Sequence, residues 1–557
     1  MDAKKITDQI SVAPQITAED VRTIAAKGFR AIICNRPDGE GADQPAFDEI
    51  ERVAREEGLT CRYLPVVSGK VTDADAADFG TALMELPGPV LAYCRTGTRC
   101  ATLWSLSKAA DTPTADILAA TKSAGYDMAG VVRRIVNGGK TPTDTGDASY
   151  DVVIVGGGAA GIAVASSLKA RRSGLEIAVI DPAGTHYYQP GWTMVGGGIF
   201  DAETTAKTMG SLIPKGVHWL KSAVAAFEPK DNAVVLDGCR VVKYKRLVVC
   251  PGLKLDWGAV EGLVETLGKN GVTSNYRYDL APYTWELVRG FKGGRALFTQ
   301  PPMPIKCAGA PQKALYLSAN NWERMGRLGS VDVQFMNAGG VLFGVKDYVP
   351  ALEKYIDRYG ATVNYFHNLT AVDGSAKTAT FTINRPDAEP ETLMTEFDMM
   401  HVTPPQTAPD FIRVSPLADA AGWVDVDQAT LRHAEYDNIW SLGDVMNAPN
   451  AKTAAAARMQ APIVAENLVD DIDGKSPTAI YNGYGSCPLT VERGKILLAE
   501  FGYGGVLLPT LPKWMIDGTK PTRAAWILKE QILPPVYWKA MLRGKEWMAK
   551  PEKISAS

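Results

Sequence analysis

Short apolar runs alternate with amphipathic stretches over the first quarter of the chain. The runs Ala31–Cys34 and Val90–Tyr93 have the length of buried strands, and apolar positions recur at helical spacing in residues 18–27 and 46–57. Such alternation is typical of an α/β fold. The following stretch, 138–149, is small and polar without periodicity, so we predict a domain over 1–137 followed by a linker.

An apolar strand, a glycine-rich turn and a helix follow this linker. The turn carries Gly156, Gly158 and Gly161, and a second apolar run ends in Asp181 about 20 residues later. Glycines here let the backbone approach a pyrophosphate, the helix N-terminus faces its charge, and the carboxylate accepts from a ribose hydroxyl. The pattern predicts a dinucleotide-binding fold.

A second, distant segment favours a flavin over NAD. Residues 438–442 read as a strand that delivers Gly443 and Asp444 ahead of a helical stretch at 451–460. In flavoproteins with two dinucleotide-binding folds, this arrangement brings the aspartate to the ribityl chain. The two segments together predict FAD.

Composition narrows the class of protein. A net charge of -3 with 22% charged and 46% hydrophobic residues indicates a globular chain with no global bias toward nucleic acid. The eight cysteines have neither metal-ligand spacing nor the framework of a small secreted protein, and the N-terminus lacks the apolar core of a signal peptide. We expect no metal and a reducing, cytoplasmic location.

Six motifs resemble the sulfide:quinone oxidoreductase family, most closely its mitochondrial branch. They lie at 186–192, 306–314, 401–405, 421–427, 452–456 and 484–489. The resemblance implies two Rossmann-like folds over 150–510 that oxidise sulfide or a small persulfide and pass electrons through FAD to a membrane quinone. It also implies further contributors to FAD binding, namely Gln189, Pro190, Trp192, Gly252 and Lys452.

Cys307 lies where related NADH-using flavoproteins carry a glycine-rich phosphate loop. The strand-like run 295–300 leads instead into Pro301, Pro302 and Pro304, and prolines lack the backbone donors that would cradle phosphate. We therefore expect the second fold to present the Cys307 thiolate to the flavin and to bind NADH poorly.

The resemblance implies a second redox cysteine directly after Gly443 and Asp444, where this chain has Val445. Cys307 is therefore predicted to act as a lone flavin-facing thiolate, whose sulfur leaves to an external thiol or to the N-terminal domain. Cys250 and Cys487 are the alternative partners.

The N-terminal domain has its own cysteine loop between a strand and a helix. Four residues separate Cys94 from Arg99, and backbone N–H groups and the Arg99 charge are expected to lower the pKa of the thiol. Residues 1 to about 135 resemble the phosphatase-like domain found beside sulfur-metabolism enzymes, but the shorter loop favours a rhodanese-like sulfurtransferase. Asp38 then reads as a turn residue, and Cys100 as a helix residue more than a resolving thiol.

The C-terminal segment 511–557 differs in composition. It holds four tryptophans and nine Lys or Arg against four Asp or Glu, with apolar residues at helical spacing in 524–533 and 536–542 around a hinge at Pro534 and Pro535. Such amphipathic helices can lie in a membrane interface. Packing against the protein's own core or a dimer partner is the alternative.

These observations predict an α/β flavoenzyme with a phosphatase-like front domain, attached peripherally to the inner membrane. Its partners would be sulfide or a persulfide, a quinone, the membrane surface, and a small thiol or thiosulfate that exchanges sulfur at Cys94. Two other functions stay open: a flavin-dependent disulfide or persulfide reductase, and a flavin-bound redox sensor whose front domain signals to a protein. The sequence leaves the quinone, the sulfur acceptor and any homo-oligomer undefined.

Overall fold

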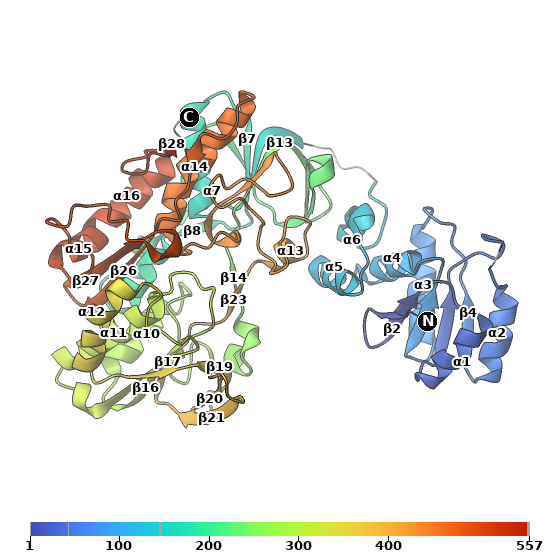
Figure 1. The fold of residues 1–557 in the computed structure, drawn as a ribbon, viewed down its shortest axis with the longest axis horizontal. Helices are drawn as coiled ribbons and strands as arrows, with labels where there is room; N and C mark the ends of the chain where they lie inside the picture. Colours follow the sequence, from blue (N-terminus) through green and yellow to red (C-terminus); the bar gives the residue numbers. More distant parts are fainter. Residues whose placement is uncertain (1, 43, 144–147, 554–557) are drawn as a thin grey trace. The chain divides into compact units, whose positions relative to one another are not determined.

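The computed structural model describes residues 2–42, 44–143 and 148–553, which divide into two units (Figure 1). The smaller unit comprises 1–149 with 222–243 and 410–418, and the larger comprises 150–221, 244–409 and 419–557. Residues 144–147 of the predicted linker and 554–557 of the predicted C-terminal segment lie outside the described residues. The α/β fold class is confirmed, and each unit is described separately below.

The smaller unit is built on a five-stranded sheet in the order β1-β2-β5-β3-β4. Its strands are β1 (Lys4–Lys5), β2 (Ile10–Ala13), β3 (Ala31–Cys34), β4 (Thr60–Tyr63) and β5 (Val90–Tyr93). All pairs are parallel except β1 with β2. The predicted strands β3 and β5 are confirmed at their boundaries.

Helices cover both faces of this sheet. They are α1 (Ala18–Ala26), α2 (Phe47–Glu56), α3 (Asp73–Glu85), α4 (Thr98–Lys108), α5 (Thr114–Ser123) and α6 (Val132–Val136). Because side chains alternate along a strand, Ile32 packs with α1 and α2 in one hydrophobic cluster, while Ile33 packs with α3 and α4 in another. The carboxyl ends of the parallel strands are thus left free for a site.

Two segments from later in the chain complete the smaller unit. Strands β11 (Val224–Glu228) and β12 (Ala233–Leu236) form an antiparallel meander with the start of β13 (Val241–Val249), and α13 (Asp410–Arg413) packs against β11. Arg133 of α6 donates to both oxygens of the Glu228 carboxylate, at distances of 2.6 to 3.0 Å. This ion pair ties the meander to the α6 end of the N-terminal domain.

The larger unit contains two sheets of the kind predicted for paired dinucleotide-binding folds. The first belongs to a seven-stranded sheet in the order β10-β7-β6-β13-β12-β11, with β24 against β13. Its further strands are β6 (Ala148–Val155), β7 (Ile177–Ile180), β10 (Val217–Leu220) and β24 (Ile439–Ser441). Helices α7 (Ala159–Arg171) and α14 (Ala454–Ile472) pack against each other beside it.

The second sheet is parallel throughout, in the order β15-β22-β16-β17-β18. Its strands are β15 (Val272–Thr273), β16 (Gly294–Gln300), β17 (Val331–Asn337), β18 (Thr362–Tyr365) and β22 (Met399–His401). Helices α10 (Ala281–Gly290), α11 (Ala310–Arg324) and α12 (Val349–Arg358) accompany it. The Cys307 loop joins β16 to α11, so it lies at the carboxyl end of a central strand.

Hairpins and short helices complete the larger unit. They are the sheet β19 (His367–Asp373), β20 (Thr378–Ile383) and β21 (Glu391–Glu396), the hairpin β26 (Gly485–Glu492) and β27 (Lys495–Phe501), and α8 (Trp192–Gly196) and α9 (Leu263–Thr266). The remaining short pairs are β8 (Thr185–Tyr187) with β9 (Ala206–Thr208), β14 (Lys254–Leu255) with β23 (Gln406–Thr407), and β25 (Ala479–Ile480) with β28 (Glu552–Lys553).

The C-terminal segment forms α15 (Arg523–Ile527), a π-helical turn at Leu528–Ile532, and α16 (Leu533–Lys539). Pro534 and Pro535 lie in the first turn of α16 and do not form the predicted hinge. The first turn tolerates proline because its N–H groups have no partner within the helix. α15 packs on β27, and the 3₁₀ turn Met541–Arg543 packs on α7.

Candidate active site

The glycine turn between β6 and α7 is shaped for a pyrophosphate. A Cβ at Gly161 would lie 1.8 Å from the Gly156 carbonyl oxygen, whereas the space around Gly158 is open within 4 Å. Asp181, at the end of β7, accepts hydrogen bonds from the backbone N–H groups of Gly157 at 2.6 Å and Ala183 at 2.8 Å. The close-packed turn, the open space beside Gly158 and the fixed Asp181 carboxylate fit the ADP half of FAD.

The second predicted flavin segment lies at the end of β24. Gly443 has a φ of 82° and donates to Gln460 Oε1 at 2.8 Å. Burial raises the pKa of the Asp444 carboxyl, and burial lowers the pKa of Lys452 to about 8. Lys452 donates to the carbonyl oxygens of Asp444 and Met446, each at 2.8 Å, and so holds the turn that follows Asp444. Gly252, with a φ of 78°, follows β13, the strand that pairs with β24.

The site around Cys307, called the cysteine site, includes two lysines, Lys306 and Lys529. These lysines contact Gln189, Pro190 and Trp192. Gln189 Oε1 accepts from Lys306 Nζ at 2.6 Å, and that ammonium lies 5.9 Å from the Trp192 ring centroid. The Pro190 carbonyl accepts from Lys529 Nζ at 3.3 Å. The segment 189–192 therefore forms one wall of the cysteine site, and FAD binding by these residues stays a prediction.

Cys307 is held in a constrained loop directly ahead of α11. Its φ is 51°, in the left-handed region that side chains other than glycine seldom adopt. The Cys307 N–H donates to the Lys452 carbonyl at 2.8 Å, and its own carbonyl accepts from Ala310 at 2.6 Å. Strain of this kind is concentrated at functional sites, where the surrounding structure maintains it.

Cys487 lies directly beside this thiol. The two Sγ atoms are 3.5 Å apart, and Lys313 Nζ donates to Cys307 Sγ at 3.0 Å. A hydrogen bond from the Cys487 thiol, together with the positive charges of Lys313 and Lys529, holds the pKa of Cys307 well below its usual value. Of the two alternative partners, β26 brings Cys487 beside Cys307, so the thiol predicted to act alone has a sulfur neighbour.

Sequence reasoning missed both lysines. Lys313 lies in the first turn of α11, six positions after Cys307. A helix predicted to begin directly after the Cys307 loop would therefore have placed this lysine near the thiol. Lys529 lies in the π-helical turn of the C-terminal segment and is 4% exposed. Burial and the charge of Lys313 lower the pKa of Lys529 to about 7. No local signal marked Lys529, since tertiary packing alone brings it to the site.

Cys250, the other alternative partner, belongs to the dinucleotide turn. Its N–H donates to the Val155 carbonyl at 2.8 Å, and its thiol is 3.7 Å from the Gly156 carbonyl oxygen. Burial raises the pKa of this thiol. Cys250 therefore packs against the glycine turn and is not a neighbour of Cys307.

The N-terminal cysteine loop lies at the carboxyl end of β5. Cys94 Sγ accepts from the Gly97 N–H at 3.2 Å. Although burial opposes it, a hydrogen bond from the Cys100 thiol and further bonds from loop N–H groups lower the pKa of Cys94 to about 5. A Cβ at Gly97 would lie 2.1 Å from the Tyr126 hydroxyl, so the loop requires glycine here. Cys100 is thus a helix residue that also supports the thiolate.

Arg99 plays a different part from the one predicted. Its guanidinium donates to Glu40 Oε1 at 2.8 Å and to the carbonyl oxygens of Asn35 and Val66. Arg99 is among the main causes that lower the pKa of Cys94. It acts there through its backbone N–H and not through its guanidinium charge. Arg99 Nε is buried without a partner among the described residues, so it could bind an anion at this loop.

Asp38 has a structural partner in the same unit. Its Oδ1 accepts from the Phe47 N–H at the start of α2 at 2.9 Å, and its own N–H donates to the Tyr63 hydroxyl at 2.8 Å. These contacts agree with the interpretation of Asp38 as a turn residue and not as the general acid of a phosphatase.

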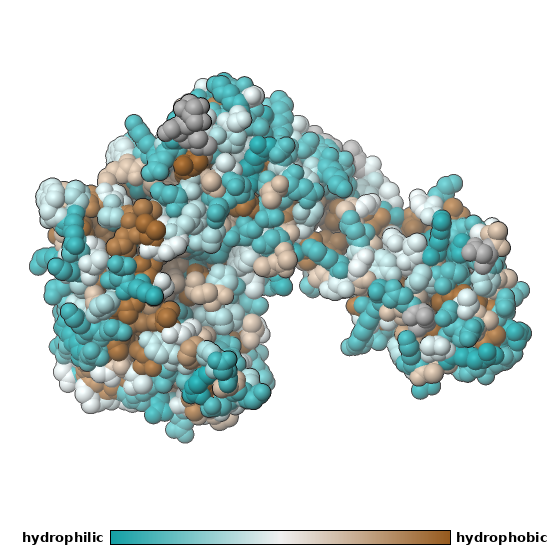
Figure 2. All heavy atoms as spheres, in the orientation of Figure 1, coloured by the Kyte–Doolittle hydropathy of each residue, from teal (hydrophilic) through white to brown (hydrophobic). Residues whose placement is uncertain are grey.

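The C-terminal segment is divided between core and surface. Trp526 and Trp538 are 6% and 8% exposed and so pack against the protein's own core, whereas Trp514 and Trp547 are 82% and 60% exposed. Figure 2 shows apolar atoms gathered over the part of the larger unit that contains α15, α16, β26 and β27. Among the described residues, no helix combines the length and apolarity needed to cross a bilayer.

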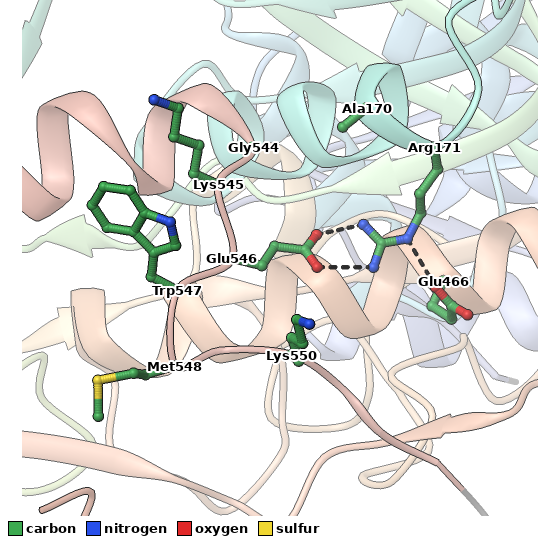
Figure 3. A pocket seen from close by; sticks show the side chains of 9 residues that line it. All are labelled: Ala170, Arg171, Glu466, Gly544, Lys545, Glu546, Trp547, Met548 and Lys550. Atoms are coloured by element: carbon green, nitrogen blue, oxygen red, sulfur yellow. Dashed lines mark hydrogen bonds and ion pairs between the residues drawn. The ribbon is translucent and has the colours of Figure 1, made fainter.

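An ion cluster fixes the end of this segment to α7 and α14. Arg171 Nε donates to Glu466 at 2.8 Å, and the same guanidinium binds both oxygens of Glu546 (Figure 3). All three side chains are about four-fifths buried. The open hollow around this cluster is lined by Trp547 and Met548 and lies apart from the residues that surround Cys307.

Comparisons with known proteins agree with these observations. Residues 2–111 match the beta-lactamase hydrolase-like protein, phosphatase-like domain, and residues 150–281 match the pyridine nucleotide-disulphide oxidoreductase family. The mitochondrial sulfide:quinone oxidoreductase of Dictyostelium discoideum is 43% identical over 403 residues, covering 72% of this chain and 87% of that protein. The Mus musculus enzyme of the same name is 39% identical over 395 residues, covering 71% and 87%.

A solved structure shows the same fold for the larger part of the chain. The sulfide:quinone oxidoreductase of Aquifex aeolicus matches with a TM-score of 0.59 at 18% identity, covering 73% of this chain and 97% of that one. The identity is low, so this match concerns the arrangement of the two Rossmann-like folds alone.

Proposed function

The chain belongs to the sulfide:quinone oxidoreductase family, and from this premise we propose that it oxidises sulfide or a small persulfide and passes the electrons to a quinone. It is an FAD-dependent oxidoreductase, and FAD when bound supplies the two-electron acceptor for the sulfur chemistry. The glycine turn at 156–161, Asp181 and the segment from Gly443 to Lys452 would hold the cofactor.

The observation that carries this proposal is the activated thiol at Cys307. A thiolate is the nucleophilic form of cysteine, and both Lys313 and the Cys487 thiol stabilise it. Hydrosulfide is an anion, and the ammonium groups of Lys313 and Lys529 supply positive charge to attract it. The proline-rich loop between β16 and Cys307 disfavours NADH as the electron donor.

Anaerobic mixing of the FAD-loaded protein with sulfide tests the proposal. Sulfide should bleach the oxidised flavin absorbance, a quinone should restore it, and NADH should bleach it slowly. Fast bleaching by NADH with none by sulfide would contradict the assignment and favour a reductase. Bleaching by sulfide without quinone turnover would favour a redox sensor.

For the N-terminal domain we propose sulfur transfer at Cys94. With a pKa lowered to about 5, this thiol is mainly thiolate at pH 7, whereas a thiol with an ordinary pKa is mainly protonated. The thiolate can take the sulfane sulfur of thiosulfate and release sulfite, forming a persulfide. The loop N–H groups and the unpartnered Arg99 Nε would hold the anion, and the hydrogen bond from the Phe47 N–H to Asp38 Oδ1 supports a structural part for Asp38.

This proposal is tested on the full-length protein. After incubation with thiosulfate, mass spectrometry should find one added sulfur on the Cys94 peptide, and Arg99→Ala should reduce the amount. Hydrolysis of a phosphotyrosine mimic with no added sulfur on Cys94 would instead establish a phosphatase.

We propose that the exposed part of the C-terminal segment attaches the protein peripherally to the inner membrane. Trp514, Ile527 and Ile532 expose apolar surface, and Lys513 and Lys520 are exposed beside Trp514 and α15. Trp514→Ser with Ile527→Ser should weaken binding to anionic vesicles. Met84→Ser, at an exposed apolar position on α3, is the control, and equal binding by all three proteins would contradict the proposal.

A further inference from the structure

We propose that Cys487 is the second redox cysteine of this chain and forms with Cys307 the disulfide that sulfide opens. The two Sγ atoms lie 3.5 Å apart although 180 positions separate them in sequence. The inference rests on the proposed function, since it assigns the sulfur partner of the same flavin-linked reaction. It also explains how the chain can use two-cysteine chemistry with Val445 after Asp444.

The local structure allows the two sulfurs to meet. A disulfide has an S–S length of about 2.05 Å, so the sulfurs must approach by about 1.5 Å. Cys487 lies on β26, where it pairs with Ala499 of β27, and Cys307 lies in the loop before α11. A Cβ at Gly309 would lie 2.6 Å from Cys487 Sγ, so glycine at this position lets the hairpin approach the loop.

The reduced pair is electrostatically asymmetric. The Cys487 thiol donates to the Cys307 thiolate, which lowers the pKa of Cys307 and, with burial, raises the pKa of Cys487. Cys487 is 2% exposed, whereas Cys307 is half-buried. Because Cys307 is the more exposed sulfur, an incoming sulfur nucleophile reaches the Cys307 side of the bridge, and the Cys487 sulfur is the leaving group, which must be protonated as it leaves.

The chemistry balances with the groups already named. Hydrosulfide attacks Cys307 Sγ, the S–S bond breaks, and Cys307 carries a persulfide anion while the Cys487 sulfur takes the proton of hydrosulfide and leaves as a thiol. An acceptor thiolate then takes the outer sulfur of the persulfide and leaves the Cys307 thiolate. When the Cys307 thiolate and the Cys487 thiol form the disulfide again, two electrons and one proton are released, which FAD when bound would accept. The sum converts hydrosulfide and a thiolate into a persulfide anion, with two electrons and one proton passed on.

The other candidates for the second sulfur do not fit. Val445 is fully buried and apolar, so it can neither bridge nor carry sulfur. Cys250 is engaged at the Gly156 carbonyl oxygen in the dinucleotide turn. Cys250, Cys307 and Cys487 are the cysteines of the larger unit, so Cys487 alone within that unit combines a thiol with contact to Cys307.

The test uses the full-length, FAD-loaded protein and the variants Cys487→Ala and Cys487→Ser, with Cys61→Ser in the smaller unit as the matched control. After turnover with sulfide and quinone, a non-reducing digest of wild type should contain a peptide in which Cys307 is linked to Cys487. Both Cys487 variants should lack it, and sulfide should reduce their flavin about 100-fold more slowly. Cys61→Ser should match wild type in both measurements.

Two results would overturn the pairing: flavin reduction at the wild-type rate in a Cys487 variant that binds FAD normally, or a Cys307 linked elsewhere or found free in oxidised wild type. If neither Cys487 variant retains FAD, the digest of wild type decides alone. Failure of the proposed function looks different. Wild type would then resist reduction by sulfide, while the linked peptide in the same sample would still support the pair.

Discussion

At the scale of single residues, both thiolates are stabilised by several hydrogen-bond donors, some neutral and some cationic. Neither thiolate depends mainly on an arginine side chain. Cys94 relies on the Cys100 thiol and on loop N–H groups, and Cys307 relies on the Cys487 thiol and on Lys313. In each case a buried thiol with a raised pKa donates to a thiolate with a lowered one. A hydrogen bond to the charged form favours that form, which is why each cysteine pair divides its proton unequally.

Removal of the Cys100 thiol tests this account at the N-terminal loop. Cys100→Ala deletes the largest cause that lowers the pKa of Cys94, so that pKa should rise from about 5 toward the ordinary value of 9.0. The pH at which Cys94 alkylation by iodoacetamide is half-maximal should therefore move upward. An unchanged midpoint would show that the loop N–H groups suffice. Cys61→Ser, on β4, is the control.

At the scale of elements, sequence patterns indicated those parts of the site that lie within one motif. The turn between β6 and α7 and the loop between β5 and α4 combine local periodicity with glycine positions, and both were predicted. Cys487 and Lys529 come from a hairpin and a π-helical turn far along the chain, and only tertiary packing brings them to Cys307. The proline pair was misread because a first helical turn and a hinge both accept proline.

The π-helical turn should act on the Cys307 thiolate through Lys529. With a pKa of about 7, Lys529 is charged below that pH, and its support fades as the pH rises through about 7. Lys529→Met removes a positive charge, so the pKa of Cys307 should rise and its alkylation should require higher pH. Lys529→Arg should restore the profile, because arginine stays charged. Equal shifts in both variants would indicate lost packing instead of lost charge.

The ion cluster of Arg171, Glu466 and Glu546 should determine whether the C-terminal segment stays packed against α7 and α14. Arg171→Ala leaves the Glu466 and Glu546 carboxylates partly buried without their main cation, which should cost about 3 kcal/mol of stability. Limited proteolysis should then cut the segment faster, and sulfide should reduce the flavin more slowly as Lys529 is displaced. Arg172→Ala, directly after α7, removes only a more exposed ion pair with Asp473 and should behave as wild type. Equal proteolysis of both variants would contradict the anchoring role.

At the scale of the whole molecule, two cysteine sites lie in separate units of one chain. Cys307, Cys487, Lys313 and Lys529 all belong to the larger unit, and Cys94 belongs with its supporting residues to the smaller one. Each site has its own activated thiolate, so each can exchange sulfur without a residue from the other. The family resemblance and the motif order predicted this division, whereas the inclusion of 222–243 and 410–418 in the smaller unit depends on tertiary packing that no local pattern shows.

Because the two sites are independent, a substitution at Cys307 should abolish one activity of the full-length protein and leave the other unchanged. Cys307→Ser should abolish flavin reduction by sulfide, because neither the thiolate nor its bridge to Cys487 can form. Thiosulfate should still load one sulfur onto Cys94 in this variant, since the Cys94 thiolate takes the sulfane sulfur and sulfite leaves without any electron reaching the flavin. Stopped-flow absorbance measures the first reaction and mass spectrometry of the Cys94 peptide the second. If Cys307→Ser loses both, sulfur reaches Cys94 only after passing through the larger unit, and the N-terminal domain is an acceptor instead of an independent sulfurtransferase.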